Sequence, residues 1–88
     1  MAITNPKYNW VVRYYAIENP KTIYNFSGFK DSGKPGYAYK FDNIEKFKTV
    51  HEAFAAAKQI IELGEYNADV CKIHIASGDD YYFTGTNL

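Results

Sequence analysis

The sequence predicts an α+β domain with an antiparallel sheet of about five strands, covered on one face by a single helix, in the order β-β-β-α-β-β. Apolar and polar residues alternate with a period of two in five short stretches, which is typical of half-buried strands. Residues 49–64 instead show the 3.6-residue period of an amphipathic helix. Turn-forming Gly, Pro, Asn and Asp lie between most of these stretches.

The first two stretches, 7–17 and 22–29, predict a hairpin. Residues 18–21 form its turn, because Pro20 supplies the fixed φ that turns often use. In the second stretch Tyr24 and Phe26 share a face. In the first stretch the even-numbered residues share a face that we expect to lie in the core, namely Tyr8, Trp10, Val12, Tyr14 and Ala16.

Residues 28–36 contain three glycines, Pro35 and two lysines, a composition that predicts a mobile surface loop. The third strand follows at 37–41, where Tyr37, Tyr39 and Phe41 share one face and Ala38 and Lys40 share the other. The alternation does not decide which of these faces is buried. If the aromatic face is exposed, Tyr37 and Tyr39 become candidate binding residues.

The helix is predicted to begin after Thr49, which can cap it together with Glu52, and to end at Gly64. The last two strands are predicted at 69–76 and 81–84, joined by a turn at 77–80. The apolar stripe of the helix, which we expect to face the sheet, consists of Val50, Ala53, Phe54, Ala57, Ile60 and Ile61.

The chain has 88 residues, which predicts one domain spanning 1–88. Its nine Tyr, six Phe and one Trp supply enough apolar surface for a core. A single cysteine, Cys71, cannot form an internal disulfide and favours a reducing compartment. No stretch approaches the ~20 apolar residues that span a bilayer, so we expect a cytoplasmic protein without a membrane partner. A formal net charge of zero argues against general polyanion binding.

The sequence offers no set of residues suited to catalysis. Cys71 and His74 point to opposite faces of a strand, so they cannot form a local nucleophile and base pair. Two separated histidines and one cysteine do not make a zinc site. We therefore predict that the protein is not an enzyme and binds no metal or cofactor.

Two surfaces carry the candidate binding residues. The sheet face away from the helix is predicted to hold interleaved cations and aromatics, which suit single-stranded nucleic acid, a nucleotide or a protein partner, although an ordinary solvated face has the same composition. The loop adds two lysines. The candidates are Arg13, Tyr15, Lys30, Lys34, Tyr37, Tyr39, Lys40, Lys72, His74 and Tyr82.

The chain also resembles a pattern common in small accessory proteins of bacteriophages and mobile elements. Residues 10–12 read Trp-Val-Val, and residues 47–53 read Phe-Lys-Thr-Val-His-Glu-Ala at the start of the helix, before a final strand pair. The resemblance implies a compact non-enzymatic protein in the cytoplasm of a bacterial host. Such a protein binds and often inhibits a host or rival factor, such as a defence nuclease, or sequesters a nucleotide signal. It implies no particular site residue.

These observations predict a non-enzymatic binding or inhibitor module, directed at a protein partner such as a host or defence factor. One alternative is a single-stranded nucleic-acid or nucleotide binder that uses the sheet aromatics. Another is a small structural or assembly protein, and the sequence leaves a homodimer open.

Overall fold

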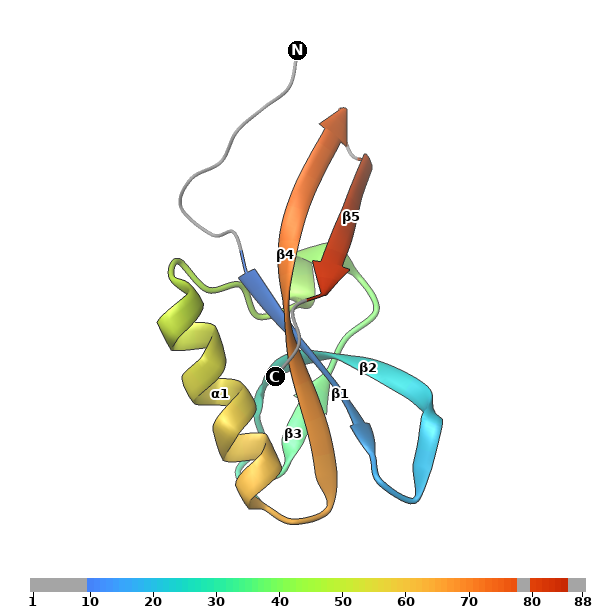
Figure 1. Ribbon diagram of the computed structural model, residues 1–88, viewed down its shortest axis with the longest axis vertical. Helices are drawn as coiled ribbons and strands as arrows, with labels where there is room; N and C mark the ends of the chain where they lie inside the picture. The colour runs from blue at the N-terminus through green and yellow to red at the C-terminus, as the bar shows by residue number, and fades with distance from the viewer. Residues whose placement is uncertain (1–9, 78–79, 86–88) are drawn as a thin grey trace.

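The computed structural model describes the backbone of residues 10–77 and 80–85, and the side chains of residues 10–74 and 84. Within this part of the chain an antiparallel sheet is combined with one helix, as Figure 1 shows, which confirms the predicted α+β class. The elements are β1 (Trp10–Ala16), β2 (Asn19–Phe29), β3 (Pro35–Tyr37), the 3₁₀ turn η1 (Phe41–Asn43), α1 (Val50–Glu62), β4 (Tyr66–Ser77) and β5 (Asp80–Gly85).

The strands lie in the order β3-β2-β1-β4-β5. β1 is central, because Arg13 pairs with Asn25 of β2 on one side and with Asp69 of β4 on the other. Four strands form the continuous sheet, and the three-residue β3 adds a short ladder along the end of β2. The predicted sheet of about five strands is therefore correct only in part, since the third strand, expected at 37–41, ends at Tyr37.

The helix begins as predicted. The Thr49 hydroxyl accepts a hydrogen bond from the Glu52 amide (3.2 Å) and donates one to the Glu52 carboxylate (3.1 Å). Gly64 follows the helix with a φ of +84°, a conformation that favours glycine, and its amide donates to the Ile61 carbonyl. No helix in the described part of the chain is long and apolar enough to cross a membrane.

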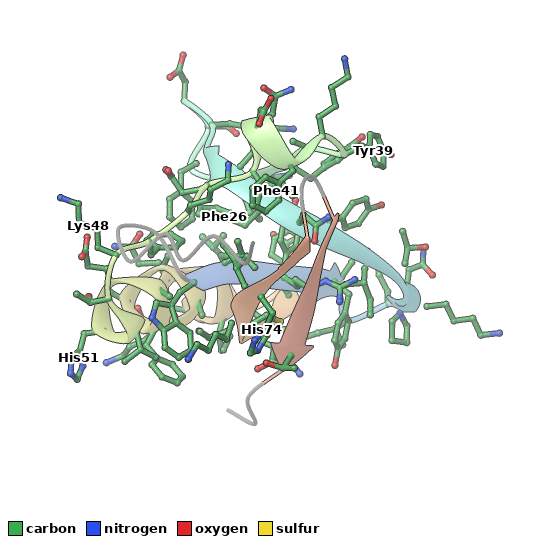
Figure 2. The ribbon with its side chains drawn as sticks, turned by 90° about the horizontal axis from the view of Figure 1, so that it is seen from above. Phe26, Tyr39, Phe41, Lys48, His51 and His74 are labelled. Carbon is green, nitrogen blue, oxygen red and sulfur yellow. The ribbon has the colours of Figure 1, made fainter. Side chains whose placement is uncertain are left out.

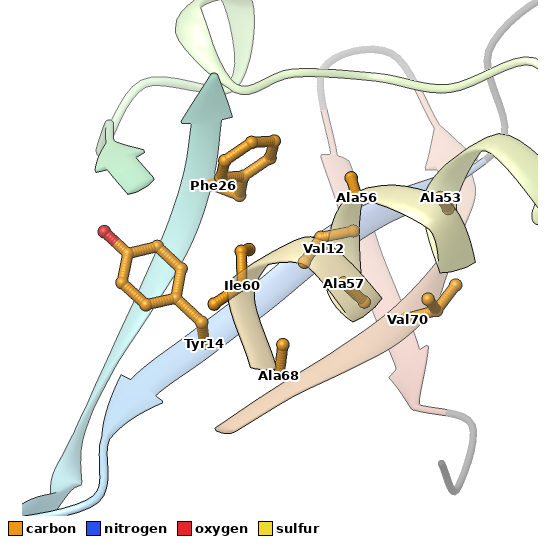
Figure 3. Close-up of a cluster of buried hydrophobic side chains, with 9 residues drawn as sticks. All are labelled: Val12, Tyr14, Phe26, Ala53, Ala56, Ala57, Ile60, Ala68 and Val70. Carbon is orange, nitrogen blue, oxygen red and sulfur yellow. The ribbon is translucent and has the colours of Figure 1, made fainter. Parts of the chain in front are cut away.

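The main core lies between α1 and the sheet (Figure 3). From the sheet it takes Val12, Tyr14, Phe26, Ala68 and Val70, and from the helix Ala53, Ala56, Ala57 and Ile60. We call the face of the sheet that carries Val12 and Tyr14 the helix side, and the opposite face the far side.

The buried stripe of the helix differs from the predicted one. Ala56 is buried, whereas Phe54 and Ile61 are 37% and 39% exposed. The small alanine side chains let the helix approach the sheet closely. The large side chains of Tyr14 and Phe26, which come from the sheet, fill the remaining space. The helix is therefore rotated so that its larger side chains flank the contact.

Part of the far side is also covered, by residues outside the helix. Val11, Cys71 and Ile73 form a second buried cluster with Ile44, against which Ala38 and Phe41 also pack. The segment after β3 crosses to this face instead of continuing as a strand.

Backbone hydrogen bonds at Glu45 and Phe47 connect the segment after β3 to the sheet. The Glu45 amide donates to the Phe26 carbonyl (2.9 Å), and Phe47 exchanges two hydrogen bonds with Trp10 (2.8 and 3.2 Å). The Lys46 ammonium donates to the carbonyls of Phe41 (2.5 Å) and Ile44 (3.0 Å). These contacts explain why an apolar stretch that reads as a strand becomes a covering segment.

The predicted loop at 28–36 is largely a hairpin. Gly28 pairs with Gly36 and Phe29 with Pro35, and the Lys30 amide donates to the Lys34 carbonyl (2.8 Å). Gly36 is required by close packing, because a Cβ there would lie 3.0 Å from the Gly28 carbonyl oxygen. The turn itself is short, and its mobility stays a prediction.

Candidate functional site

The structure distributes the predicted binding residues over separate regions. In an antiparallel sheet, directly opposed residues lie on the same face. Arg13 opposes Asp69, which places it on the far side, whereas Lys72 opposes Trp10 on the helix side. His74, two residues after Lys72, lies on the helix side as well. We expected the face away from the helix to carry Arg13, Tyr15, Lys40, Lys72, His74 and Tyr82. That expectation is wrong, because Lys72 and His74 lie on the helix side.

On the far side, the polar residues of β1 interact mainly with their neighbours on β4. Arg13 is half-buried between Asn25 and Asp69, and the Tyr15 hydroxyl accepts a hydrogen bond from the Asn67 amide group (2.9 Å). Burial raises the pKa of Asp69, while the Val70 amide and the Arg13 charge oppose the shift. Arg13 and Asp69 are thus partly withdrawn from solvent between the strands, and Tyr15 is bonded across to β4.

The region of Lys72 and His74 lies along β4. The Lys72 ammonium is 5.8 Å from the centre of the Trp10 ring, and His74 Nε2 is 2.9 Å from the Thr84 hydroxyl on β5. Tyr82 pairs with His74 in the backbone register, but its side chain lies outside the described residues. Figure 2 shows His74 well apart from Tyr39, so these candidates do not form a common site.

Tyrosine side chains gather at the edge of the sheet formed by β2 and β3. Tyr37 opposes Phe26 and so lies on the helix side, where its ring centre is 4.7 Å from that of Tyr24 and 5.7 Å from that of Tyr39. Tyr37 is 47% exposed and Tyr39 is 81% exposed. We call Tyr24, Tyr37 and Tyr39 the tyrosine edge.

The position of the helix explains why this edge is open. α1 packs mainly against β1 and β4. Of β2 it helps to bury Phe26, whereas Tyr24 is half-buried and Tyr37 on β3 is 47% exposed. Figure 1 shows the helix on one flank of the sheet, and Figure 2 shows Tyr39 projecting outward at the opposite end of the molecule from Lys48 and His51. The edge is thus a surface on which aromatic rings meet solvent.

The tyrosine edge continues into the core. The ring of buried Tyr14 lies 5.4 Å from that of Tyr24 and 5.7 Å from that of Tyr66. The Tyr14 hydroxyl donates a hydrogen bond to the carbonyl of buried Pro35 (3.1 Å). Burial, followed by the neighbouring rings of Tyr66, Tyr24 and Tyr37, raises the pKa of Tyr14 to about 12. Tyr14 therefore stays neutral and connects β1 to the edge.

Three of the candidate lysines follow the same part of the chain. Lys30 and Lys34 are exposed on either side of the β2–β3 turn, and Lys40 is exposed directly after Tyr39. Asp31 and Asp42 are exposed between and beyond them. The edge is therefore only weakly cationic, and its aromatic rings are its most distinctive feature.

Of the three rings in the tyrosine edge, sequence reasoning named Tyr37 and Tyr39 as binding candidates and placed Tyr24 only on the same face as Phe26. Tyr24 is half-buried and belongs to both the core and the edge, because it touches Tyr14 on one side and Tyr37 on the other. The signal was present in the alternation of β2, which places Tyr24 on the same face as Phe26. What was missing was the pairing of β2 with β3.

Within the described residues, no group of three or more His, Cys, Asp or Glu side chains is arranged to hold a metal ion. Burial raises the pKa of the Cys71 thiol, and the nearby Asp69 charge adds to the effect, against an opposing contribution from Arg13. A thiol in this environment is a poor nucleophile, because the thiolate is the reactive form.

Comparison of the chain with models of known protein families, with curated proteins and with solved structures finds no match. The resemblance to bacteriophage accessory proteins stays a prediction.

Proposed function

We propose that the protein is a non-enzymatic binding module that contacts a protein partner through the tyrosine edge. The observation that carries the proposal is that the tyrosine rings are exposed to solvent and are also packed against neighbouring rings. Tyr39 and Tyr37 present 81% and 47% of their surface to solvent, yet each ring touches another and the row ends on buried Tyr14.

Such rings suit protein recognition for a physical reason. A tyrosine side chain offers a large apolar surface and a hydroxyl, and only two torsions must be fixed on binding. Rings already held by neighbouring rings lose less freedom when a partner docks. Tyrosine is accordingly enriched among the residues that dominate the energy of protein interfaces.

The environment of the remaining reactive groups agrees with a binding role. Cys71 is buried with a raised pKa, and His74 lies on the opposite face of the sheet from it. If the resemblance to bacteriophage accessory proteins is meaningful, the partner is a host or defence factor. The tyrosine edge would then be the inhibitory surface.

A photo-crosslinking experiment in the source cells tests the proposal. A photoreactive phenylalanine analogue replaces Tyr39 in one version of the protein and Lys58, an exposed helix residue, in the other. Tyr39 is so exposed that its replacement should leave the fold intact, which circular dichroism checks.

We expect a discrete crosslinked protein from the Tyr39 version and none, or a much weaker band, from the Lys58 version. Identical crosslinking patterns from the two positions would mean that the tyrosine edge is no more a contact surface than the helix. Absence of any crosslinked protein at Tyr39 would remove the proposal.

A second candidate function, binding of single-stranded nucleic acid, is favoured by one observation. Tyr39 exposes most of its ring and is followed by exposed Lys40, a pairing that can stack a base and contact a phosphate. An oligothymidine titration monitored by tyrosine fluorescence tests it. Binding through this pair should quench fluorescence and weaken as salt increases. A flat titration at low salt would exclude it.

A further inference from the structure

We propose that two copies of this chain associate through β5, so that their sheets join into one continuous antiparallel sheet. This pairing is independent of the proposed function, because β5 lies at the opposite end of the strand order from β3 and the tyrosine edge. Backbone hydrogen bonding makes the occupant of this edge a strand, and sequence and charge make it a second β5.

The outer side of β5 presents an open row of backbone groups. β5 pairs with β4 in five successive opposed pairs, from Cys71 with Gly85 to Ile75 with Tyr81. It is the last strand of the sheet, and no residue in the described part of the chain pairs with its other side. The N–H and C=O groups along such an edge form a template for pairing with another strand.

The hairpin of β4 and β5 also lacks a third strand over part of its length. β1 pairs with β4 from Tyr66 to Lys72, so the described residues of β4 beyond Lys72 pair with β5 alone. Figure 1 shows β4 and β5 projecting together past the helix and the other strands. A two-stranded hairpin is marginally stable in water, and a further strand stabilises it.

The two edges of the sheet differ in how strongly their sequences oppose such pairing. Lys, Pro, bulges and short length commonly protect edge strands. The edge at β3 combines Pro35 and a length of three residues with a register shift between Phe26 and Gly28, and Lys34 directly precedes it. β5 has six residues without Lys or Pro, and its register with β4 is regular from 71 to 75.

The sequence of β5 is complementary to itself in the antiparallel direction. About a two-fold axis at Tyr82, Asp80 opposes Thr84 of the second copy, and Tyr81 opposes Phe83 of the second copy. Aromatic residues then oppose aromatic residues, which is a favourable cross-strand pairing, and like charges do not oppose each other. In-register parallel pairing would instead place the two copies of Asp80 side by side. The formal net charge of zero adds no overall repulsion between two chains.

The helix leaves room for the second copy. α1 packs mainly against β1 and β4, so both copies of β5 would separate the two helices. At about 4.8 Å between strands, the two β4 strands lie about 14 Å apart, whereas a helix is about 10 to 12 Å wide.

Sedimentation velocity over a concentration series tests the pairing. We expect a wild-type dimer with a Kd below about 1 mM. Tyr82→Lys and Tyr82→Glu each place like charges opposite one another, so each variant alone should associate about tenfold more weakly or worse. An equimolar mixture of the two should recover the dimer, because Lys then opposes Glu. Tyr39→Lys, at the other edge, is the control and should associate like the wild type.

Hydrogen exchange of the wild type gives a measurement that does not depend on the folding of any variant. The amides of residues 80–85 should exchange more slowly at high than at low protein concentration, while those of β2 stay unchanged.

Four results would overturn the proposed pairing. They are a wild type that stays monomeric at about 1 mM, folded Tyr82 variants whose mixture is no more dimeric than either alone, exchange in β5 that is independent of concentration, and loss of the dimer in Tyr39→Lys but not in Tyr82→Lys. Crosslinking at Tyr39 tests the proposed function separately, so either proposal can fail while the other stands.

Discussion

Tyr14 belongs both to the core and to the row of rings that ends at Tyr39. It is 3% exposed, it touches Tyr24, Phe26 and Tyr66, and its hydroxyl donates a hydrogen bond to the Pro35 carbonyl on β3. One side chain therefore supports the helix side of the sheet and helps hold β3 in position. This dual role makes Tyr14 the residue at which fold and candidate site can be separated experimentally.

We expect Tyr14→Phe to lower the free energy of unfolding by about 1 kcal/mol, because the Pro35 carbonyl loses its donor. Urea denaturation measures the change. Tyr39→Phe is the matched control, since it removes the same atom from an exposed ring and should leave stability unchanged. Equal effects of the two substitutions would show that the Tyr14 hydroxyl makes no net contribution.

The raised pKa of Tyr14 predicts a dependence of stability on alkaline pH. The folded state holds the phenol proton up to a pKa of about 12, above the ordinary tyrosine pKa of 10.0, so the unfolded state loses the proton first. The contribution of this group is fully present below pH 10 and is lost as the pH rises to about 12. The stability of the wild type should fall more steeply than that of Tyr14→Phe in this window, as measured by urea denaturation at each pH. Parallel curves of stability against pH for the two proteins would contradict this prediction.

Cys71 should react slowly with iodoacetamide in the native protein. The thiol is 4% exposed and its pKa is raised, so little thiolate is available or accessible. Mass spectrometry of timed samples should show labelling far slower than in urea, where the chain is open. Native labelling as fast as labelling in urea would place Cys71 outside the core of the far side.

The elements show where pattern reading succeeds and where it fails. The helix start at Thr49 was predictable because capping is a local interaction of residues three apart in the sequence. The rotation of the helix was not, because it depends on how Tyr14 and Phe26 fill the space that Ala53, Ala56 and Ala57 leave. Helical periodicity predicts which side of the helix is apolar. It does not predict the small rotation of the helix that buries Ala56 and leaves Phe54 partly exposed.

Two neighbouring isoleucines of α1 test this rotation directly. Ile60 is fully buried and Ile61 is 39% exposed. We expect Ile60→Ala to cost about 2 to 5 kcal/mol of stability through lost contacts and a residual cavity. The same substitution at Ile61 should cost less than about 1 kcal/mol. Chemical denaturation of both variants provides the comparison, and the reverse ranking would show that the helix is packed the other way round.

Residues 38–41 are the part of the chain that sequence reasoning misjudged. Alternation of Tyr37, Tyr39 and Phe41 predicted a strand, but Ala38, Phe41 and Ile44 instead pack on the far side against the cluster of Val11, Cys71 and Ile73. That cluster exists because β1 buries both Val11 and Val12, one on each face. Two adjacent valines in one strand point to opposite faces, so their pairing in the sequence indicates that both faces of the strand are covered.

At the scale of the whole molecule, aromatic residues serve two purposes. Most of the described rings, including those of Tyr14 and Phe26, fill the layer between helix and sheet or flank it. Tyr37 and Tyr39 instead lie exposed on and just after β3, while Tyr15 and Phe41 lie on the far side. Composition alone could not make this division, because it depends on which strand pairs at the edge and on how much of the sheet α1 covers.

The same reasoning explains the outcome for the other candidate residues. Strand alternation correctly separated Cys71 from His74, but it could not relate the face of β1 to that of β4 without their register. A shift of one residue in the register of β4 against β1 would have placed Cys71 on the helix side and Lys72 on the far side. The tyrosine edge is therefore the part of the predicted site that the fold assembles, and Arg13 and Lys72 belong to different surfaces.

The central claim is that the free protein already presents the tyrosine edge as exposed rings in front of a buried one. Photochemically induced dynamic nuclear polarisation measures this directly, because a flavin dye polarises only tyrosine rings that it can reach. We expect strong signals from Tyr39 and Tyr37, assigned with Tyr39→Phe and Tyr37→Phe, and none from Tyr14. A silent Tyr39, or a Tyr14 as strongly polarised as Tyr39, would contradict the account.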